Sequence, residues 1–337
     1  MRIKWESGVL IEHRGNRIIL DPTSKNPRCR VAFITHAHAD HSSAFRADKI
    51  SKFSSEETMS LVAIDGVKVQ EWHPIKVKEK VVMDDFEVTP HYSGHVLGSY
   101  EFEIATPEGT VLFTGDLNTR SSRTIKPADP IKCDVLVLES TFGSPSFVFP
   151  PDEIVAKGMI EWASRSLKEG KIPVFRADSL GNAQEVIRIF NEDTNIPVVS
   201  HWRVSKINRV YEAYGYRMKY FDIRSVEAYD LISRRNAIIV APKRLESTYH
   251  PDFISALVSG WALRFKGTSF PLSDHADFPS LMEFVSECGP KIVLTCHGGG
   301  FSNILAKYVE KNLGIKAYPV NLIPTNFSLS SPFLKKF

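Results

Sequence analysis

The chain has 337 residues, of which 43% are hydrophobic and 24% are charged, which fits one large or two medium globular domains with a substantial core. No apolar run approaches the ~20 residues of a transmembrane helix, and the N-terminus lacks the charged-then-apolar layout of a secretory signal, so we expect a cytoplasmic protein with no membrane partner. Four cysteines without CxxC spacing suggest neither a zinc knuckle nor a disulfide framework, and the formal net charge of +3 is compatible with a polyanionic partner.

The first third of the chain predicts short strands joined by turns. Runs rich in β-branched and aromatic residues are separated by Gly, Asn, Asp and Pro, which is typical of hairpins and sheet. The expected strands are residues 8–13, 17–21, 31–35, 68–72, 81–91, 100–105, 110–115 and 133–140.

The pattern changes near residue 148. Residues 149–171 begin with Pro-Pro-Asp, place Val155, Met159, Trp162 and Ala163 on one face and end in Gly-Lys, which predicts a helix. Strands and helices then alternate, which indicates a parallel α/β unit. The expected strands are 172–177, 196–200, 237–242 and 291–297, and the expected helices are 181–192, 206–215 and 278–289. We therefore expect an α/β (α+β) protein with a β-rich domain in two parts, residues 1–147 and 259–337, interrupted by an α/β insertion over 148–258.

Residues 33–41, FITHAHADH, crowd three histidines and one aspartate into six positions. In an extended backbone His36 and His38 point to the same side, so they can bind one metal ion. Asp40 and His41 follow where the chain must turn, and can reach a second ion. Imidazole and carboxylate ligands suit Zn²⁺, with Mn²⁺ or Fe as alternatives.

Further ligands are expected where other strands end. The stretch PHYSGHVLGS offers His91 and His95, with Gly94 and Gly98 permitting close approach of the backbone. Asp116 follows a buried strand and a glycine, where it is placed to bridge two cations, and His297 follows another. We expect the carboxylate of Asp21, after the strand RIIL, to orient a ligand histidine.

Each of these residues taken singly has an ordinary explanation. A single loop histidine is usually a surface residue, and an aspartate after a strand is usually a turn or cap residue. The crowding in 36–41 and the recurrence at three further strand ends make a metal site the better explanation. Four histidines lack such context, and we expect them to be structural: His13, His73, His201 and His250.

The ordered motifs resemble those of a known family. THAHADH, SGHVLGS and FTGDLN are similar to the metal motifs of the metallo-β-lactamase fold, and ESTFG, LSDHAD and TCHGGG to the additional motifs of its β-CASP nucleases. The layout is similar to short bacterial ligase-associated DNA exonucleases and archaeal mRNA 3′-end processing factor-like proteins. The resemblance implies an αββα sandwich carrying two divalent ions, with the insertion as a β-CASP cap that forms one wall of a substrate cleft.

The resemblance also implies roles for individual residues. One ion takes His36, His38, His95 and Asp116, and the other takes Asp40, His41, His297 and the shared Asp116. A hydroxide bridging the ions attacks phosphorus, and His275 protonates the leaving oxygen with Glu139 as its partner. Without the resemblance, LSDHAD also fits a helix N-cap, and Glu139 a solvated acid at the end of a strand.

The segment RADSLGNAQEV resembles a phosphate-facing motif of the cap but departs from it. Asn182 stands where a lysine is expected, and Asp178 where an aromatic residue is expected; loss of the cation predicts a weaker grip on phosphate. The candidate substrate contacts are Ser179, Gly181, Lys243, Arg244, Arg264 and Lys266, with Trp202 or Trp261 as a stacking platform for an unpaired base.

These observations leave three function classes. The first is a dinuclear metal nuclease, expected to be an exonuclease on single-stranded DNA ends, with RNA 3′-end processing as the alternative and DNA-repair or RNA-processing proteins as partners. The second is another metallo-hydrolase of the same fold, although those lack the motifs around Glu139 and His275. The third is a non-catalytic scaffold, which the full set of seven metal ligands disfavours.

Overall fold

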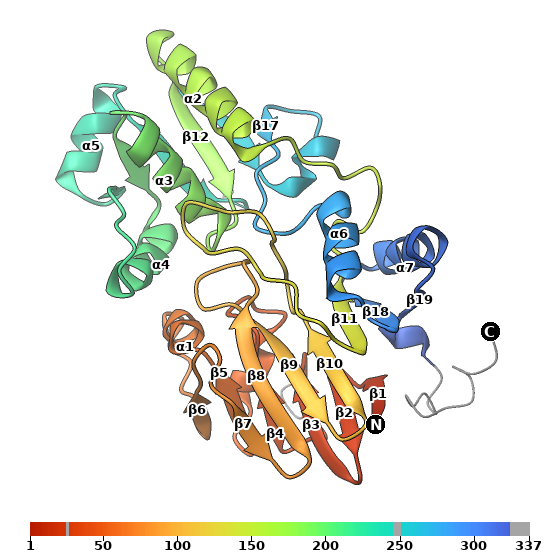
Figure 1. The fold of residues 1–337 in the computed structure, drawn as a ribbon. Helices are drawn as coiled ribbons and strands as arrows, with labels where there is room; N and C mark the ends of the chain where they lie inside the picture. The colour runs from red at the N-terminus through yellow and green to blue at the C-terminus, as the bar shows by residue number, and fades with distance from the viewer. Residues whose placement is uncertain (25–26, 245–250, 324–337) are drawn as a thin grey trace. The chain divides into compact units, whose positions relative to one another are not determined.

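The computed structural model describes residues 1–24, 27–244 and 251–323, and the chain forms two compact units (Figure 1). Unit 1 comprises Met1–Arg120, Lys126–Ser146 and His275–Phe337, and unit 2 comprises Ser121–Ile125 and Phe147–Asp274. The chain therefore enters unit 2 twice and returns to unit 1 each time. Within the described residues, no helix is long and apolar enough to cross a membrane.

Unit 1 contains two sheets. The first has the order β1-β2-β3-β4-β5-β6, antiparallel from β1 to β3 and parallel from β3 to β6. The second has the order β19-β18-β11-β10-β9-β8-β7, parallel from β19 to β10 and antiparallel from β10 to β7. The strands of the first sheet are β1 (Arg2–Trp5), β2 (Val9–His13), β3 (Asn16–Leu20), β4 (Val31–Phe33), β5 (Ser51–Ser54) and β6 (Trp72–Pro74). Those of the second are β7 (Val81–Met83), β8 (Phe86–Tyr92), β9 (Tyr100–Thr106), β10 (Gly109–Phe113), β11 (Val135–Glu139), β18 (Ile292–Cys296) and β19 (Lys316–Pro319).

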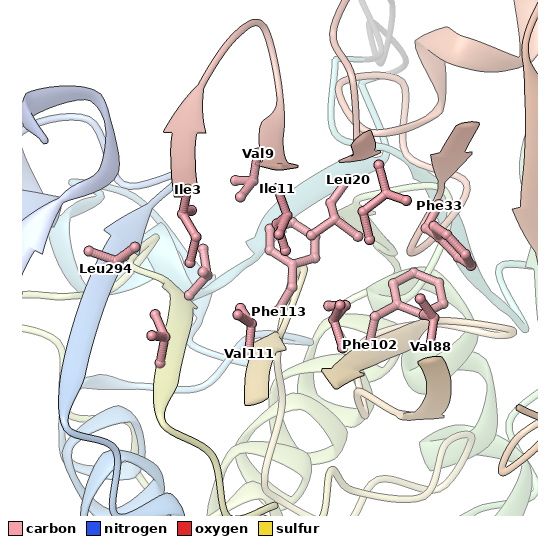
Figure 2. Close-up of a cluster of buried hydrophobic side chains, with 14 of the residues drawn as sticks. Ile3, Val9, Ile11, Leu20, Phe33, Val88, Phe102, Val111, Phe113 and Leu294 are labelled. Carbon is pink, nitrogen blue, oxygen red and sulfur yellow. The ribbon is translucent and has the colours of Figure 1, made fainter. Parts of the chain in front are cut away.

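The two sheets face each other across one apolar core. Figure 2 shows side chains of both sheets in this core, among them Ile11 and Phe33 from the first sheet and Phe102 and Phe113 from the second. Successive side chains of a strand point to opposite faces of its sheet. The apolar side chains on the outer face of each sheet therefore need a second layer to cover them.

Helices supply that second layer on both sides. Leu10 of β2 packs with Phe45 of the 3₁₀ helix η1 (Ser42–Arg46) and Val62 of α1 (Glu56–Ala63). Leu136 of β11 packs with Phe284 of α6 (Phe278–Cys288) and with residues of α7 (Gly300–Leu313). A further 3₁₀ helix, η3 (Val320–Leu322), follows β19. The expected αββα sandwich is thus confirmed.

Unit 2 is built on one parallel sheet with the order β14-β13-β15-β12-β16-β17. Because all its strands run the same way, the residues that follow them gather at one edge of the sheet, its carboxyl edge. The strands are β12 (Ile172–Ala177), β13 (Val198–Ser200), β14 (Phe221–Asp222), β15 (Ile238–Pro242), β16 (Phe253–Val258) and β17 (Ser269–Phe270). The helices are α2 (Asp152–Lys168), α3 (Asn182–Asp193), α4 (Trp202–Ala213), α5 (Val226–Ser233) and the 3₁₀ helix η2 (Gly260–Arg264).

Several boundaries differ from those expected. Helix α4 begins at Trp202 rather than at residue 206, because His201 accepts a hydrogen bond from the backbone N–H of Arg203 and caps the helix. Strand β6 begins at Trp72, where the strand expected over 68–72 ends, because Lys52 of β5 pairs with Trp72. Unit 2 continues past residue 258 to Asp274, since β17 pairs with β16 and extends the same sheet.

Candidate metal centre

The HAHADH loop follows β4 and folds back on itself. The backbone N–H of Tyr100 donates to the carbonyl of Thr35 (2.9 Å), which fixes the start of the loop. The N–H of His41 donates to the carbonyl of His38 (3.1 Å), which turns the chain. As a result, the rings of His36 and His41 are both buried, with their centres 4.1 Å apart.

The first group of ligand atoms brings this loop together with two others. His36, His38, His95 and Asp116 offer ligand atoms that all lie within 4.8 Å of one another. Nδ1 of His38 lies 3.1 Å from Nε2 of His36 and 3.0 Å from Nε2 of His95. Oδ2 of Asp116 lies 3.4 Å from Nε2 of His36 and 3.6 Å from Nε2 of His95. These four residues are the ones expected to hold the first ion.

The second group also reaches the carboxylate of Asp116. Asp40, His41 and His297 offer ligand atoms within 4.8 Å of one another. Nε2 of His41 lies 3.6 Å from Oδ2 of Asp40 and 3.4 Å from Oδ2 of Asp116. The ring of His297 stacks on that of His41 with centres 4.5 Å apart. Asp116 therefore faces both groups, which is the position a shared ligand requires.

Two glycines allow the loops to approach so closely. A Cβ on Gly94 would lie 2.0 Å from the carbonyl oxygen of Asn118, next to the loop that carries Asp116. A Cβ on Gly298 would lie 2.1 Å from the carbonyl oxygen of Ser140. The first glycine after His297 thus sets how near that loop lies to the end of β11.

The carboxylate of Asp21 forms hydrogen bonds to the loop that carries the histidines. Its Oδ2 accepts from Nδ1 of His41 (2.7 Å) and from the hydroxyl of Thr35 (2.6 Å), and its Oδ1 accepts from the backbone N–H of Thr35 (2.8 Å). Because Nδ1 of His41 is engaged by Asp21, the other ring nitrogen, Nε2, is directed at Asp116. The orienting role expected of Asp21 stays a prediction, but the geometry fits it.

Thr35 is a residue that the sequence analysis missed. Its hydroxyl lies 2.9 Å from Nδ1 of His36 and donates to Asp21, so it is placed to fix the orientation of the His36 ring. The available signal was its position directly before the first histidine, which is weak because threonine is common at the ends of strands.

The buried polar atoms of the centre fit divalent cations. Nε2 of His41 and Oδ1 of Asp116 are buried and have no hydrogen-bond partner within the described ranges. Leaving such atoms unpaired costs about 1–3 kcal/mol each, and a bound cation removes that cost. The donors are imidazole nitrogens and carboxylate oxygens, as Zn²⁺ and Mn²⁺ prefer.

The pKa shifts of the residues in the centre also fit a bound cation. Burial would raise the pKa of Asp116, but the charges of His41 and His275 hold it well below its ordinary value. Burial would lower the pKa of His41, but the carboxylates of Asp116 and Asp21 raise it to about 10. Burial, with the charge of His41, holds the pKa of His36 well below its usual range. The carboxylates at this centre therefore favour a positive charge beside them.

A histidine–glutamate pair stands beside the centre. Nδ1 of His275 lies 2.9 Å from Oε1 of Glu139, and Nε2 of His275 lies 4.0 Å from Oδ2 of Asp116. Glu139 also accepts from the backbone N–H groups of Leu117 (2.9 Å) and Thr141 (3.0 Å). Burial would raise the pKa of Glu139, but the charge of His275 lowers it. The side chain of His275 is 17% exposed, whereas those of His36, His41 and His95 are at most 1% exposed.

The other histidines in the described part of the chain lie outside these groups. His91, offered by the sequence as a ligand beside His95, pairs with Glu103 across the strands at 3.0 Å. His13 lies between the carboxylates of Asp85 and Glu108, and His73 stacks on Phe53. His201 caps α4, and His250 lies outside the described residues.

The candidate substrate contacts all lie in unit 2. Ser179 and Gly181 precede α3. There the side chain of Gln184 accepts a hydrogen bond from the backbone N–H of Gly181 and donates one to the backbone carbonyl of Ser179. Lys243 is 3.3 Å from both Asp178 Oδ2 and Ser259 Oγ. Arg244 and Lys266 are exposed, and the guanidinium of Arg264 lies 4.3 Å from the ring centre of Phe147, which also meets Trp261 edge-on. Their contact with substrate stays a prediction.

No family model matches the chain. A probable DNA ligase of Opitutus terrae is 30% identical over 303 residues, which are 86% of this chain and 28% of that protein. An RNase J-like protein of Methanocaldococcus jannaschii is 27% identical over 222 residues, which are 55% of this chain and 51% of that protein. The alignments thus cover between about a quarter and a half of these curated relatives.

A solved structure shares the whole fold. A protein of unknown function from Enterococcus faecalis V583 superposes with a TM-score of 0.70 at 12% identity, covering 96% of this chain and 97% of that one. That likeness concerns the fold alone, whereas the two relatives above are similar to this chain in sequence. With its ordered motifs and convergent histidine–aspartate centre, the chain belongs to the β-CASP branch of the metallo-β-lactamase fold family.

Proposed function

We propose that this protein is a metal-dependent nuclease that hydrolyses phosphodiester bonds of nucleic acid. The observation that carries the proposal is the position of Asp116, whose Oδ2 lies within 4.0 Å of a nitrogen of four different histidines. Three of them belong to the two ligand groups, and the fourth, His275, is tied to Glu139. A metal centre and a proton donor thus share one carboxylate.

We infer that two divalent ions bind here. One would be held by His36, His38, His95 and Asp116, and the other by Asp40, His41, His297 and Asp116. When bound, such ions neutralise phosphate charge and lower the pKa of water toward neutrality. Zn²⁺ is the expected metal, with Mn²⁺ as the alternative.

His275 is placed to protonate the leaving oxygen. As the P–O bond breaks, that oxygen gains negative charge and takes the proton from Nε2 of His275. Glu139 accepts from Nδ1 and stabilises the imidazolium, while Leu117 and Thr141 hold the carboxylate in place. This pair distinguishes the proposed nuclease from other metallo-hydrolases of the fold.

DNA is the substrate that we favour. The relative that aligns with most of this chain is named as a probable DNA ligase, which fits an exonuclease that trims single-stranded DNA ends for a ligase partner. RNA is the second candidate, because another relative is named as RNase J-like. We assign unit 2 as the β-CASP cap, with Ser179, Gly181, Lys243, Arg244 and Arg264 as phosphate contacts.

One experiment tests activity, sugar preference and polarity together. The metal-loaded protein is incubated with single-stranded DNA and RNA labelled at the 5′ or the 3′ end, with Asp116→Ala as control. We expect a ladder of DNA products that Asp116→Ala abolishes. Hydrolysis of bis-p-nitrophenyl phosphate without cleavage of any oligonucleotide would contradict the proposal.

A further inference from the structure

The first five residues of α4 in unit 2 combine one large aromatic ring with two cations. The guanidinium carbon of Arg203 lies 5.2 Å from the ring centre of Trp202, and Nζ of Lys206 lies 5.3 Å from it. The ring of His201 adjoins the indole with centres 5.5 Å apart. We call Trp202, Arg203 and Lys206 the α4 cluster.

Neither cation has an acidic partner among the residues that the structure describes. Across the described ranges, no carboxylate lies within the 4.0 Å of an ion pair from either Arg203 or Lys206. One turn further along α4, by contrast, Arg209 lies 3.7 Å from Asp222. The first turn of α4 also contains no acidic residue, so Arg203 stands uncompensated at the positive end of the helix dipole, and Lys206 follows at the start of the second turn. An anionic ligand would neutralise both charges.

The cluster lies at the carboxyl edge of the parallel sheet, where ligands of open α/β sheets bind. It follows β13 directly, as Lys243 follows β15 and Ser179 follows β12. A buried polar network fixes α4 there, because Asn208 accepts from Gln184 of α3 (2.9 Å) and contacts the hydroxyl of Ser200. The first turn of α4 is therefore held on a rigid support.

We propose that the α4 cluster is a subsite for an unpaired nucleotide of single-stranded nucleic acid. A base stacks on the indole of Trp202 in place of one of the flexible cations, and Arg203 and Lys206 pair with the adjoining phosphates. In a duplex the bases are already stacked on one another, so this subsite selects unpaired strands. The identification of this ligand as substrate rests on the proposed nuclease function.

The test is the affinity of the full-length, metal-loaded protein for a fluorescent oligothymidine with hydrolysis-resistant phosphorothioate linkages. Stacking is worth about 1–3 kcal/mol per base, so Trp202→Ala is expected to weaken binding by roughly tenfold, and Trp202→Phe by much less. Each phosphate contact contributes about 0.7 to the slope of log affinity against log salt for single strands. The double variant Arg203→Gln/Lys206→Gln is therefore expected to flatten that slope by about 1.4.

Matched controls lie in the same unit. Arg209→Gln removes a charge from the same helix, and Tyr229→Ala removes an aromatic ring that is 73% exposed on α5. Both are expected to bind like the unchanged protein. Thermal melting shows whether each variant is folded, and if Trp202→Ala is not, the double variant decides.

Some outcomes overturn the subsite. They are a Trp202→Ala affinity within twofold of the unchanged protein, an equal loss of affinity for duplex DNA, or displacement of the oligonucleotide by polyglutamate at equal charge concentration, which would indicate an acidic protein partner instead. Binding needs no hydrolysis, so the two proposals fail separately. Binding through Trp202 without cleavage of any strand contradicts the nuclease alone, and cleavage without dependence of affinity on Trp202 contradicts the subsite alone.

Discussion

Oδ2 of Asp21 lies 2.7 Å from Nδ1 of His41, and both side chains are almost completely buried. Asp21 comes from the end of β3 and His41 from the loop after β4, two neighbouring parallel strands. This hydrogen bond joins Asp21 to a residue that is expected to bind the second ion. The metal centre thus depends on a carboxylate that is not expected to touch metal.

Asp21→Asn tests that dependence. The amide keeps the size of the side chain but loses the charge that favours the orientation of His41, so metal affinity is expected to fall about 10–100-fold. Metal content after dialysis against graded chelator measures it. Asp85→Asn is the matched control, because Asp85 lies beside His13, outside the centre. Equal metal retention in both variants would contradict the orienting role.

His275→Ala separates proton donation from metal binding. Loss of a general acid is expected to lower turnover of an oligonucleotide by about 10²–10⁴-fold while both ions stay bound. Metal analysis and turnover are measured on the same sample, with His73→Ala as the control histidine. Unchanged turnover, or turnover lost together with the metal, would refute the assigned role.

Glu139→Gln is expected to change the pH dependence of the reaction. Burial would raise the pKa of Glu139 and the charge of His275 lowers it, so the two groups stabilise each other in their charged forms. Removing the carboxylate removes the support for the imidazolium, and the alkaline fall in turnover moves to lower pH. A profile that is lower in height but not displaced would show that Glu139 acts only in packing.

Gly298→Ala tests how closely the His297 loop must approach β11. The added Cβ would lie 2.1 Å from the carbonyl oxygen of Ser140, which must move, so we expect a loss of stability of about 1–3 kcal/mol and weaker binding of the second ion. Gly300→Ala is the matched control two residues away, because nothing lies within 4 Å of its Cβ. Equal denaturant midpoints and metal content for the two variants would count against this account.

Glu101 predicts a stability effect outside the centre. It is fully buried in β9, neither carboxylate oxygen has a hydrogen-bond partner among the described residues, and burial, with the charges of Asp129 and Glu103, raises its pKa well above the ordinary value. The folded state therefore keeps a proton that the unfolded state loses above about pH 4.3. Stability falls as pH rises from there toward the folded-state pKa, by at most about 1.4 kcal/mol per pH unit.

Glu101→Gln removes that titration. Its free energy of unfolding, measured in urea from pH 5 to pH 8, is expected to fall less with pH than that of the unchanged protein. Glu87→Gln is the control, since Glu87 is partly exposed and paired with Lys80. Parallel profiles for the unchanged protein and Glu101→Gln would show that the carboxylate is not held in its neutral form.

The sequence predicted the residues of the candidate metal centre more completely than the contacts of the loops around it. Crowded histidines and strand-end aspartates are local signals, and they named every residue of the two ligand groups. The role of Thr35 and the contact of Gly298 with Ser140 depend on which loops meet in space, which one sequence does not show. The same limit hid the place of residues 121–125, which belong to unit 2 because Glu185 accepts from the N–H of Arg123 and the hydroxyl of Thr124.

Secondary structure was predicted best where the pattern was long. Helix α2 and the hairpin strands follow from periodicity and turn residues. The short helices α1 and α5 and the two-residue strands β14 and β17 were missed, and so was the 14-residue helix α7. Elements of two to eight residues give little periodic signal, and their stability comes from tertiary packing.

The most direct test of the central claim is a crystal structure of the metal-loaded protein with anomalous scattering measured at the zinc and manganese edges. We expect two peaks, one among His36, His38 and His95 and one among Asp40, His41 and His297, each with a carboxylate oxygen of Asp116 as ligand. A single peak, or an Asp116 that ligates neither ion, would contradict the account.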